Sequence, residues 1–237
     1  MRSSLSAVIL VLVSASPLFA QNPVTRGYLT GVGGMVFYKN ISGFSTSGSQ
    51  ATSDLGLGLG ARLKGHLMIV GNGGWMRNMQ KGLQPLLVAT TNTIYNVHAI
   101  STTGTGKLPA WYGEGGLSLN GPTWGLWTPY VVGEYGLARL TPSVTLQYKS
   151  GTIPGQTTSP PSAGSDQTAL FERLGYLRVP GTTMTQMFSG AGGVRLAIAK
   201  RAIATGEWRY SRFGSDSTLG TGAFSTNELA FGFGLRF

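Results

Sequence analysis

Eight charged residues recur on the small-residue side of short segments in which bulky and small residues alternate. Carboxylates and guanidinium groups form two-sided, charge-assisted hydrogen bonds, so such a set can hold a protein interior together or can line a path for ions or protons. Counting along neighbouring segments places Arg195 beside Glu134 and Glu207, and Arg209 near Glu228. The full set of candidate residues is Glu114, Glu134, Glu207, Glu228, Arg62, Arg195, Arg209 and Arg236.

Residues suited to catalysis are few. The chain has no cysteine and only two histidines, His66 and His98. His98 with Ser101 is the one pair that could imitate a hydrolase or acyltransferase site, but no acidic partner lies near it in sequence. Two histidines so far apart do not make a metal site. We therefore predict no catalytic residues, no cofactor and no metal.

The last twelve residues show most clearly which element carries the charges. Leu229, Phe231, Phe233, Leu235 and Phe237 share one parity, and Glu228, Ala230, Gly232, Gly234 and Arg236 share the other. Alternation with period two indicates a strand with two unlike faces. A bulky apolar face and a small or charged face are typical of a strand that faces lipid outward and a narrow polar lumen inward.

The same alternation recurs along the chain and predicts eight strands. The facing of the first strand stays open, because both of its parities carry bulky residues. The predicted strands cover 27–38, 55–63, 67–75, 111–119, 129–137, 188–198, 202–210 and 226–237.

Connections between these segments alternate between short and long. Short turns at 64–65, 120–123 and 200–201 separate long connections at 39–53, 76–108, 141–184 and 214–225. Short periplasmic turns and long outer loops are typical of an outer-membrane barrel. We predict an all-β fold, an eight-stranded antiparallel up-and-down transmembrane β-barrel, in the bacterial outer membrane.

Two loop segments leave alternatives open. Residues 86–101 have a strand-like composition, and we expect them to extend a hairpin above the membrane. A ten-stranded barrel with a further strand at 143–149 is the alternative. Residues 166–174, followed by Gly175, fit one short capped helix.

The N-terminus resembles a secretory signal. Arg2, a short apolar stretch and the small residue Ala20 predict a signal peptide at 1–20 and a barrel domain at 21–237. Glycine is abundant at 37 residues, which disfavours a helical protein. The formal net charge is +10, but an export signal argues against nucleic acid as the partner.

Basic residues are concentrated in and beside the long connections. Cations near an anionic surface favour binding to phosphate-bearing lipid. We expect membrane lipids, including lipopolysaccharide, to be partners of these loops. The basic residues are Lys39, Arg77, Lys81, Lys107, Arg139, Lys149, Arg173, Arg178 and Arg212.

The segments Thr128-Pro129-Tyr130-Val131-Val132-Gly133 and Gly-Phe-Gly-Leu-Arg-Phe, at 232–237, resemble the small outer-membrane β-barrel family. That family includes the transmembrane domain of outer membrane protein A and the opacity-type proteins. The resemblance implies an interior held by Glu–Arg networks. It also implies that the last strand is a signal for the barrel-assembly machinery, carried here by Phe231, Phe233, Leu235 and Phe237.

An eight-stranded barrel has an interior that side chains can fill, so the charge set favours a plugged lumen over a channel. The predicted role is structural or in surface interaction, without enzyme activity. A narrow porin for small solutes and a lipid-A-modifying enzyme are the alternatives.

Overall fold

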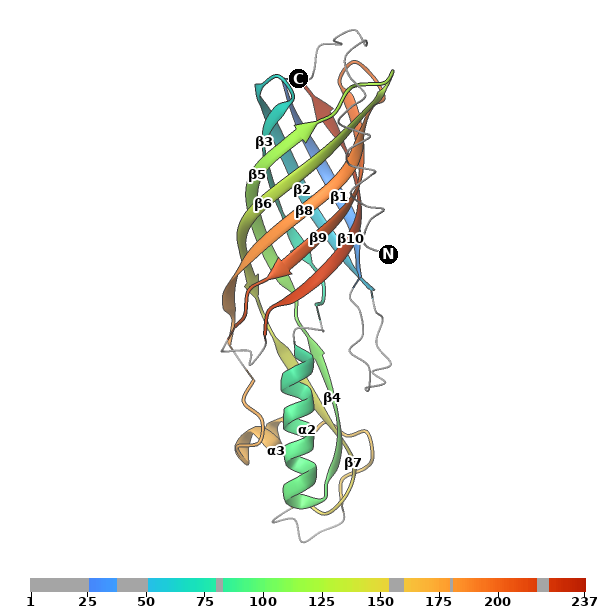
Figure 1. The fold of residues 1–237 in the computed structure, drawn as a ribbon. Helices are drawn as coiled ribbons and strands as arrows, with labels where there is room; N and C mark the ends of the chain where they lie inside the picture. The colour runs from blue at the N-terminus through green and yellow to red at the C-terminus, as the bar shows by residue number, and fades with distance from the viewer. Residues whose placement is uncertain (1–25, 38–50, 80–82, 154–159, 180, 217–221) are drawn as a thin grey trace, which may run out of the picture.

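The alternation in the sequence gives the strands an outward apolar row and, along most of their length, an inward row of small or polar residues, which is the pattern of a membrane-spanning barrel. The computed structural model describes residues 26–37, 51–79, 83–153, 160–179, 181–216 and 222–237. Within them an antiparallel barrel closes in the order β1-β10-β9-β8-β6-β5-β3-β2 (Figure 1). Its strands are β1 (Gly27–Phe37), β2 (Ala51–Lys64), β3 (Leu67–Met76), β5 (Ala110–Asn120), β6 (Trp127–Leu140), β8 (Thr183–Ala197), β9 (Ala202–Phe213) and β10 (Phe224–Arg236). The predicted eight-stranded barrel is confirmed.

First and last strands complete the barrel. Ten residue pairs join β1 to β10, from Tyr28 opposite Arg236 to Phe37 opposite Asn227. On β1 the side chains of Tyr28 and Val36 are buried, whereas Leu29 and Met35 are exposed. Both parities of this strand carry bulky residues because its inward side chains help to fill the lumen.

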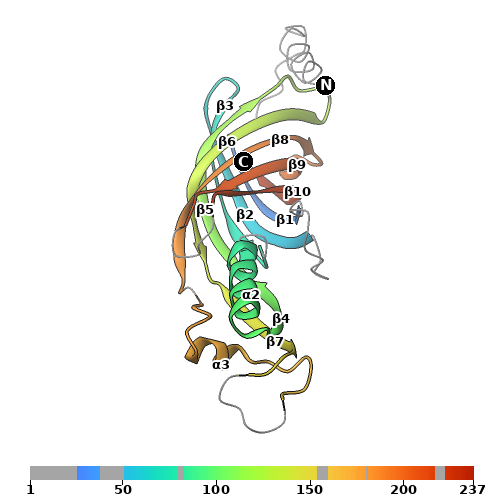
Figure 2. The ribbon, with the colours of Figure 1, turned by 60° about the horizontal axis from the view of Figure 1, so that its bottom comes forward.

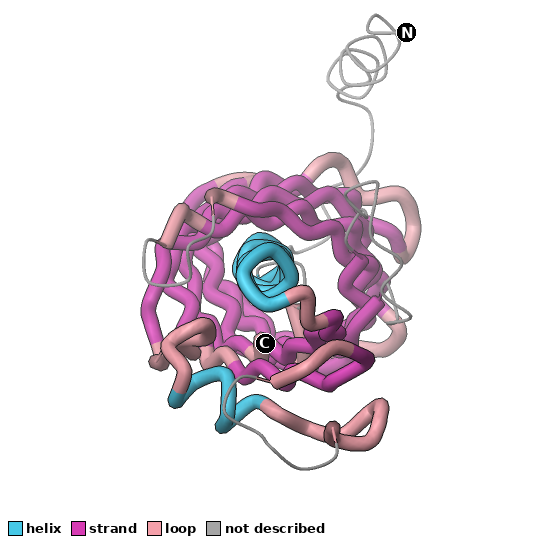
Figure 3. Tube along the Cα trace, turned by 90° about the horizontal axis from the view of Figure 1, so that it is seen from below, coloured by secondary structure: helices cyan, strands magenta, loops and turns pink. Residues whose placement is uncertain are grey.

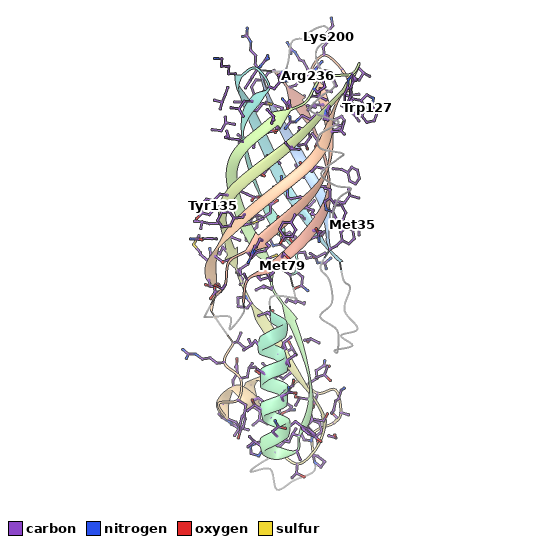
Figure 4. All side chains as sticks on the ribbon, in the orientation of Figure 1. Met35, Met79, Trp127, Tyr135, Lys200 and Arg236 are labelled. Carbon is purple, nitrogen blue, oxygen red and sulfur yellow. The ribbon has the colours of Figure 1, made fainter. Side chains whose placement is uncertain are left out.

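The two ends of the barrel differ. Turns at 65–66, 121–126 and 198–201 lie at one end, called here the inner end, and the long connections leave from the other, the outer end. Figure 4 shows Lys200 and Arg236 at the inner end and Met79 at the outer end. In barrels of this type the short turns face the periplasm.

Beyond the outer end, the long connections build a folded extension. It contains α2 (Gln84–His98), β4 (Ser101–Lys107), β7 (Ser143–Ser150) and α3 (Thr168–Arg173). Strand β4 pairs with β7 in a separate two-stranded sheet. Figures 2 and 3 show α2 beyond the barrel mouth, lying roughly along the barrel axis.

Two predictions for this region need correction. Residues 86–101 are mostly helical instead of forming a strand, because Leu83, Leu87, Thr90 and Ile94 bury one face at helical spacing. A strand near 143–149 exists, but it pairs with β4 outside the barrel, so the ten-stranded alternative is wrong.

The short helix α3 falls within the predicted segment 166–174. Its start is held by Asp166, whose Oδ1 accepts a hydrogen bond from the Thr168 amide at 2.9 Å. Hydrogen bonds from Thr168 lower the pKa of the Asp166 carboxyl. Gly175 follows at φ 78°, a left-handed conformation that favours glycine at a helix end.

No helix among the described residues is both long enough and apolar enough to cross a membrane. The predicted signal peptide at 1–20 lies outside the described residues.

Candidate functional site: the barrel lumen

Arg209 of β9 is the centre of an ion-pair cluster inside the barrel. Its Nη1 lies 2.8 Å from Glu114 Oε1 and 2.6 Å from Glu134 Oε2, and its Nη2 lies 2.8 Å from Glu207 Oε1. These four residues, the Arg209 cluster, come from β5, β6 and β9. The guanidinium therefore links three strands across the lumen with charge-assisted bonds.

Neutral side chains complete the cluster. The Asn72 amide donates to Glu134 Oε1 at 2.7 Å, and the Tyr130 hydroxyl donates to Glu207 Oε2 at 2.6 Å. Asn72 lies on β3 and Tyr130 on β6. Six inward side chains thus form one connected network, which is how buried charges are tolerated in a narrow interior.

Arg195 lies one layer nearer the inner end, and its predicted contacts with Glu134 and Glu207 are wrong. Register explains this: Arg195 pairs with Thr128 of β6 and Thr205 of β9, while Glu134 pairs with Ser189. The guanidinium instead donates to Asn120, to Ser118 at 3.2 Å and to Tyr28 at 3.2 Å.

The same guanidinium stacks on tyrosine rings. Its Cζ lies 3.8 Å from the ring centroid of Tyr130 and 4.8 Å from that of Tyr28. The rings and the hydrogen-bonding groups together surround a buried cation, and we call this set the Arg195 site. Cation–π contacts of this kind are worth about 2 kcal/mol when they are desolvated.

Replacing Arg195 with lysine is expected to destabilise the barrel even though the charge is kept. An ammonium cannot stack between two rings or form the planar fork of donors. We expect the free energy of unfolding to fall by about 1–2 kcal/mol, measured by urea titration in lipid vesicles. Arg201→Lys, at an exposed turn position, is the control and should leave the midpoint unchanged. Equal midpoints for both variants would contradict the role of stacking.

Two predicted lumen arginines lie at the inner rim, outside the ion-pair layers. Arg62 is exposed, and its Nε donates to the Gly65 carbonyl at 2.9 Å. Arg236 is partly exposed, and its Nε donates to the Lys200 carbonyl at 3.1 Å. Both residues have the inward parity that the sequence predicts. The ends of their strands project past the lumen, however, so water and turn carbonyls solvate the two guanidinium groups.

Glu228 occupies a third layer, nearer the outer end. It pairs with Arg209 in the β10–β9 register, as predicted. The ion pairs of Arg209 described above, however, go to Glu114, Glu134 and Glu207. The carboxyl of Glu228 lies within hydrogen-bonding reach of the Asp54 carboxyl on β2. Asp54 also accepts a hydrogen bond of 2.7 Å from the Tyr112 hydroxyl.

A layer of apolar side chains lies inside the barrel beyond these charges, toward the outer end. They point inward from seven strands and are buried, and Phe213 stacks on Phe224 with ring centroids 4.7 Å apart. Together they form one cluster with the core of the extension, including Leu83, Ile94 and Leu146. This outer apolar layer consists of Val36, Met76, Ala110, Ala138, Leu140, Met187, Phe213 and Phe224.

Several residues of these layers were missed from the sequence. Tyr28, Tyr130 and Asn72 share the inward parity, but the sequence did not show that they bind the charges. Asp54 lies just before the predicted strand at 55–63, although it continues the inward row of Gly56 and Gly58 toward the outer end. Extending the alternation by one step would have placed it in the lumen.

Solved structures show what this architecture resembles. Neisserial surface protein A matches with a TM-score of 0.51 and 13% identity, over 90% of this chain and 98% of that chain. Ail, the attachment invasion locus protein of Yersinia pestis, has a TM-score of 0.46 and 9% identity, with 90% and 99% covered. OprG from Pseudomonas aeruginosa has a TM-score of 0.44 and 10% identity, with 90% and 96% covered. No family model and no curated protein sequence matches the chain.

The fold is that of the small eight-stranded outer-membrane β-barrels. Its outer surface agrees with that environment, because Leu57, Leu117, Val131 and Phe233 are exposed on the outward parity. Figure 4 shows Met35, Trp127 and Tyr135 on the outside of the barrel. The fold and the apolar outward face are those of a membrane-spanning β-barrel.

The C-terminal residues named in the resemblance form an outward row on and just after β10. Phe231, Phe233, Leu235 and Phe237 are each more than half exposed. Phe237 is also tied to the start of β1, since its amide donates to the Gly27 carbonyl at 2.9 Å.

Neither histidine is part of a recognisable catalytic site. His98 ends α2, and its Nε2 contacts the hydroxyl of Tyr176 rather than Ser101. His66 is exposed in the turn after β2. No cluster of metal-binding side chains occurs among the residues that the structure describes.

Basic side chains surround the outer end and the extension. Arg139 and Arg212 lie on the outward parity near the outer ends of β6 and β9, and Arg77 directly follows β3. Lys107, Lys149, Arg173 and Arg178 are exposed on the extension, whereas Lys39 and Lys81 lie outside the described residues.

Proposed function

We propose that this protein is a non-conducting outer-membrane barrel that presents its extension for surface interaction, without enzyme activity. The continuous apolar cluster from the outer apolar layer into the extension core supports this proposal. A closed mouth leaves no wide path for solute, and a shared core holds the extension at a fixed place beyond the barrel. The exposed side of α2, with Asn92, Tyr95, Asn96 and Val97, is uncharged and suits contact with another protein.

Planar-bilayer recordings test the closed lumen. The wild-type barrel should give no discrete conductance steps, because the Arg209 cluster and the outer apolar layer fill successive levels of the lumen. An open porin, reconstituted in the same lipids, is the positive control. Regular single-channel steps from the wild-type protein would support the narrow-porin alternative instead.

The enzyme alternative has less support from the site. A hydrolase or acyltransferase needs a base oriented by a third group and placed against a nucleophile. His98 contacts Tyr176, which lies in a connection of the extension, and Ser101 begins β4. Equal lipid A modification by wild type and His98→Ala, both at background level, would agree with the non-enzymatic proposal.

Lipopolysaccharide is the proposed lipid partner. Arg77, Arg139 and Arg212 are exposed at the outer end of the barrel, where the phosphates of outer-leaflet glycolipid would lie. Each such cation contributes about 1 kcal/mol near an anionic surface.

Replacing these three arginines with glutamine should weaken lipopolysaccharide binding by about 3 kcal/mol, or roughly a hundredfold. Binding of purified lipopolysaccharide to the barrel in nanodiscs of neutral lipid measures this effect. Arg62→Gln with Arg201→Gln, exposed at the inner end, is the control and should bind like wild type. An unchanged affinity of the triple variant would exclude the proposed partner.

The C-terminal row is proposed to be read by the barrel-assembly machinery. Before β10 pairs with its neighbours in the barrel, its main chain can form hydrogen bonds with a partner strand, and its apolar row can enter side-chain pockets of that partner. The outward exposure of Phe233 and Leu235 supports this role.

A further inference from the structure

We propose that Asp54 and Glu228 form a proton-binding site in the lumen, in which two buried carboxyl groups share one proton. Both residues are 2% exposed. Asp54 lies on β2 and Glu228 on β10, the two strands that flank β1. We call these residues the acid pair.

Gly34 of β1 lets the two carboxyls meet. In register, Gly34 pairs with Asp54 on one side and with Ala230, two residues from Glu228, on the other. A Cβ at this position would lie 2.2 Å from Glu228 Oε1. The carboxyl of Glu228 thus fills the space that a side chain at position 34 would occupy.

Hydrogen bonding in the acid pair is incomplete in a way that indicates a proton. Asp54 Oδ1 and both Oε atoms of Glu228 are buried without a conventional donor. A buried oxygen without a donor is costly, and two adjacent carboxylates repel. One proton between them removes a negative charge and supplies the missing hydrogen bond.

The charges around the acid pair also favour a bound proton. Among the described residues, the groups that face the acid pair are Tyr112 from β5, and Arg209 and Glu207 from β9. Arg209 is already engaged by Glu114, Glu134 and Glu207. Within the part of the chain that the structure describes, five carboxyls share the lumen layers with the guanidiniums of Arg195 and Arg209, an excess of negative charge that a bound proton reduces.

The acid pair lies where a bound proton can stabilise the closure of the barrel. The shared proton joins β2 to β10 across β1, at the seam where the first and last strands pair. Loss of the proton would place two negative charges on either side of this seam. Proton uptake therefore stabilises closure.

Infrared spectroscopy of the whole folded barrel in lipid vesicles tests the shared proton directly. At neutral pH the wild type should show the carbonyl band of a protonated carboxyl, and this band should disappear in Asp54→Asn and in Glu228→Gln. Glu172→Gln, in the exposed part of the extension, should keep it. A wild-type spectrum without the band, or a band that survives in both acid-pair variants, would overturn the proposal.

A second measurement uses proton linkage. Unfolding releases the shared proton once the pH exceeds the ordinary range of carboxyl groups. As the pH rises by one unit, this release should lower the ratio of folded to unfolded wild-type protein about tenfold. Glu228→Gln should lack this additional tenfold decrease. Equal slopes would overturn the proposal. If the slope of the wild type instead vanishes as sodium is raised at constant ionic strength, a metal cation and not a proton occupies the site.

Discussion

Replacing Arg209 with glutamine should lower the free energy of unfolding of the barrel by about 3–5 kcal/mol, the usual cost of removing one partner from a buried charge cluster. The side chain of Arg209 is 6% exposed, and those of Glu114 and Glu134 are fully buried. Glutamine keeps much of the volume but leaves the carboxylates without their cation. Urea unfolding in lipid vesicles, followed by tryptophan fluorescence, measures the change.

Arg212→Gln is the matched control, since Arg212 lies on the same strand but is exposed on the outward parity. It should shift the free energy of unfolding by less than about 0.5 kcal/mol. Adding Glu114→Gln and Glu134→Gln to Arg209→Gln should recover part of the loss, because the uncompensated charges are then removed. A variant as stable as wild type would show that the Arg209 cluster contributes nothing to stability.

Truncating Phe213 to alanine should cost about 3–5 kcal/mol, because it opens a cavity in the outer apolar layer. Phe213 is fully buried, and its ring stacks on Phe224 at an interplanar angle of 11°. The neighbouring inward side chains come from separate strands of a closed barrel, so they cannot move together to fill the space. The same urea titration measures this loss.

Phe188→Ala is the comparison for Phe213→Ala. Phe188 is 53% exposed on the outward face of β8, where lipid can fill the space that truncation leaves. We expect a loss of less than half that of Phe213→Ala, because the cavity contribution is absent. Similar losses at both sites would mean that the outer end of the lumen is loosely packed.

Much of the barrel could be predicted from local alternation. Each strand must present one face to lipid and one to a narrow lumen, so parity alone assigns Phe231 outward and Glu228 inward. The alternation of short and long connections gave the strand count and the two ends. Alternation does not reveal pairing across the lumen, however. Arg195 and Arg209 look equivalent in sequence, yet one is surrounded by tyrosines, one amide and one hydroxyl and the other by three glutamates.

The extension was the least predictable region. Thr91, Thr93 and Ile94 suggested a strand, but tertiary packing selected a helix in which Thr91 and Thr93 hydroxyls donate to backbone carbonyls one turn earlier. Spacing of Leu83, Leu87, Thr90 and Ile94 carried the helical signal. Likewise, the strand at 143–150 was identifiable, but its partner was not.

The sequence by itself determined the barrel and the inward face of each strand that carries Glu228, Arg195 and Arg209, because each follows from which face of a strand a residue occupies. Only the tertiary structure decided which charges meet. Strand stagger sets the level of each inward side chain in the lumen, and that level depends on the register of every neighbouring strand at once. For this reason Asp54 and Glu228, 174 positions apart in the chain, share one site that no local pattern indicates.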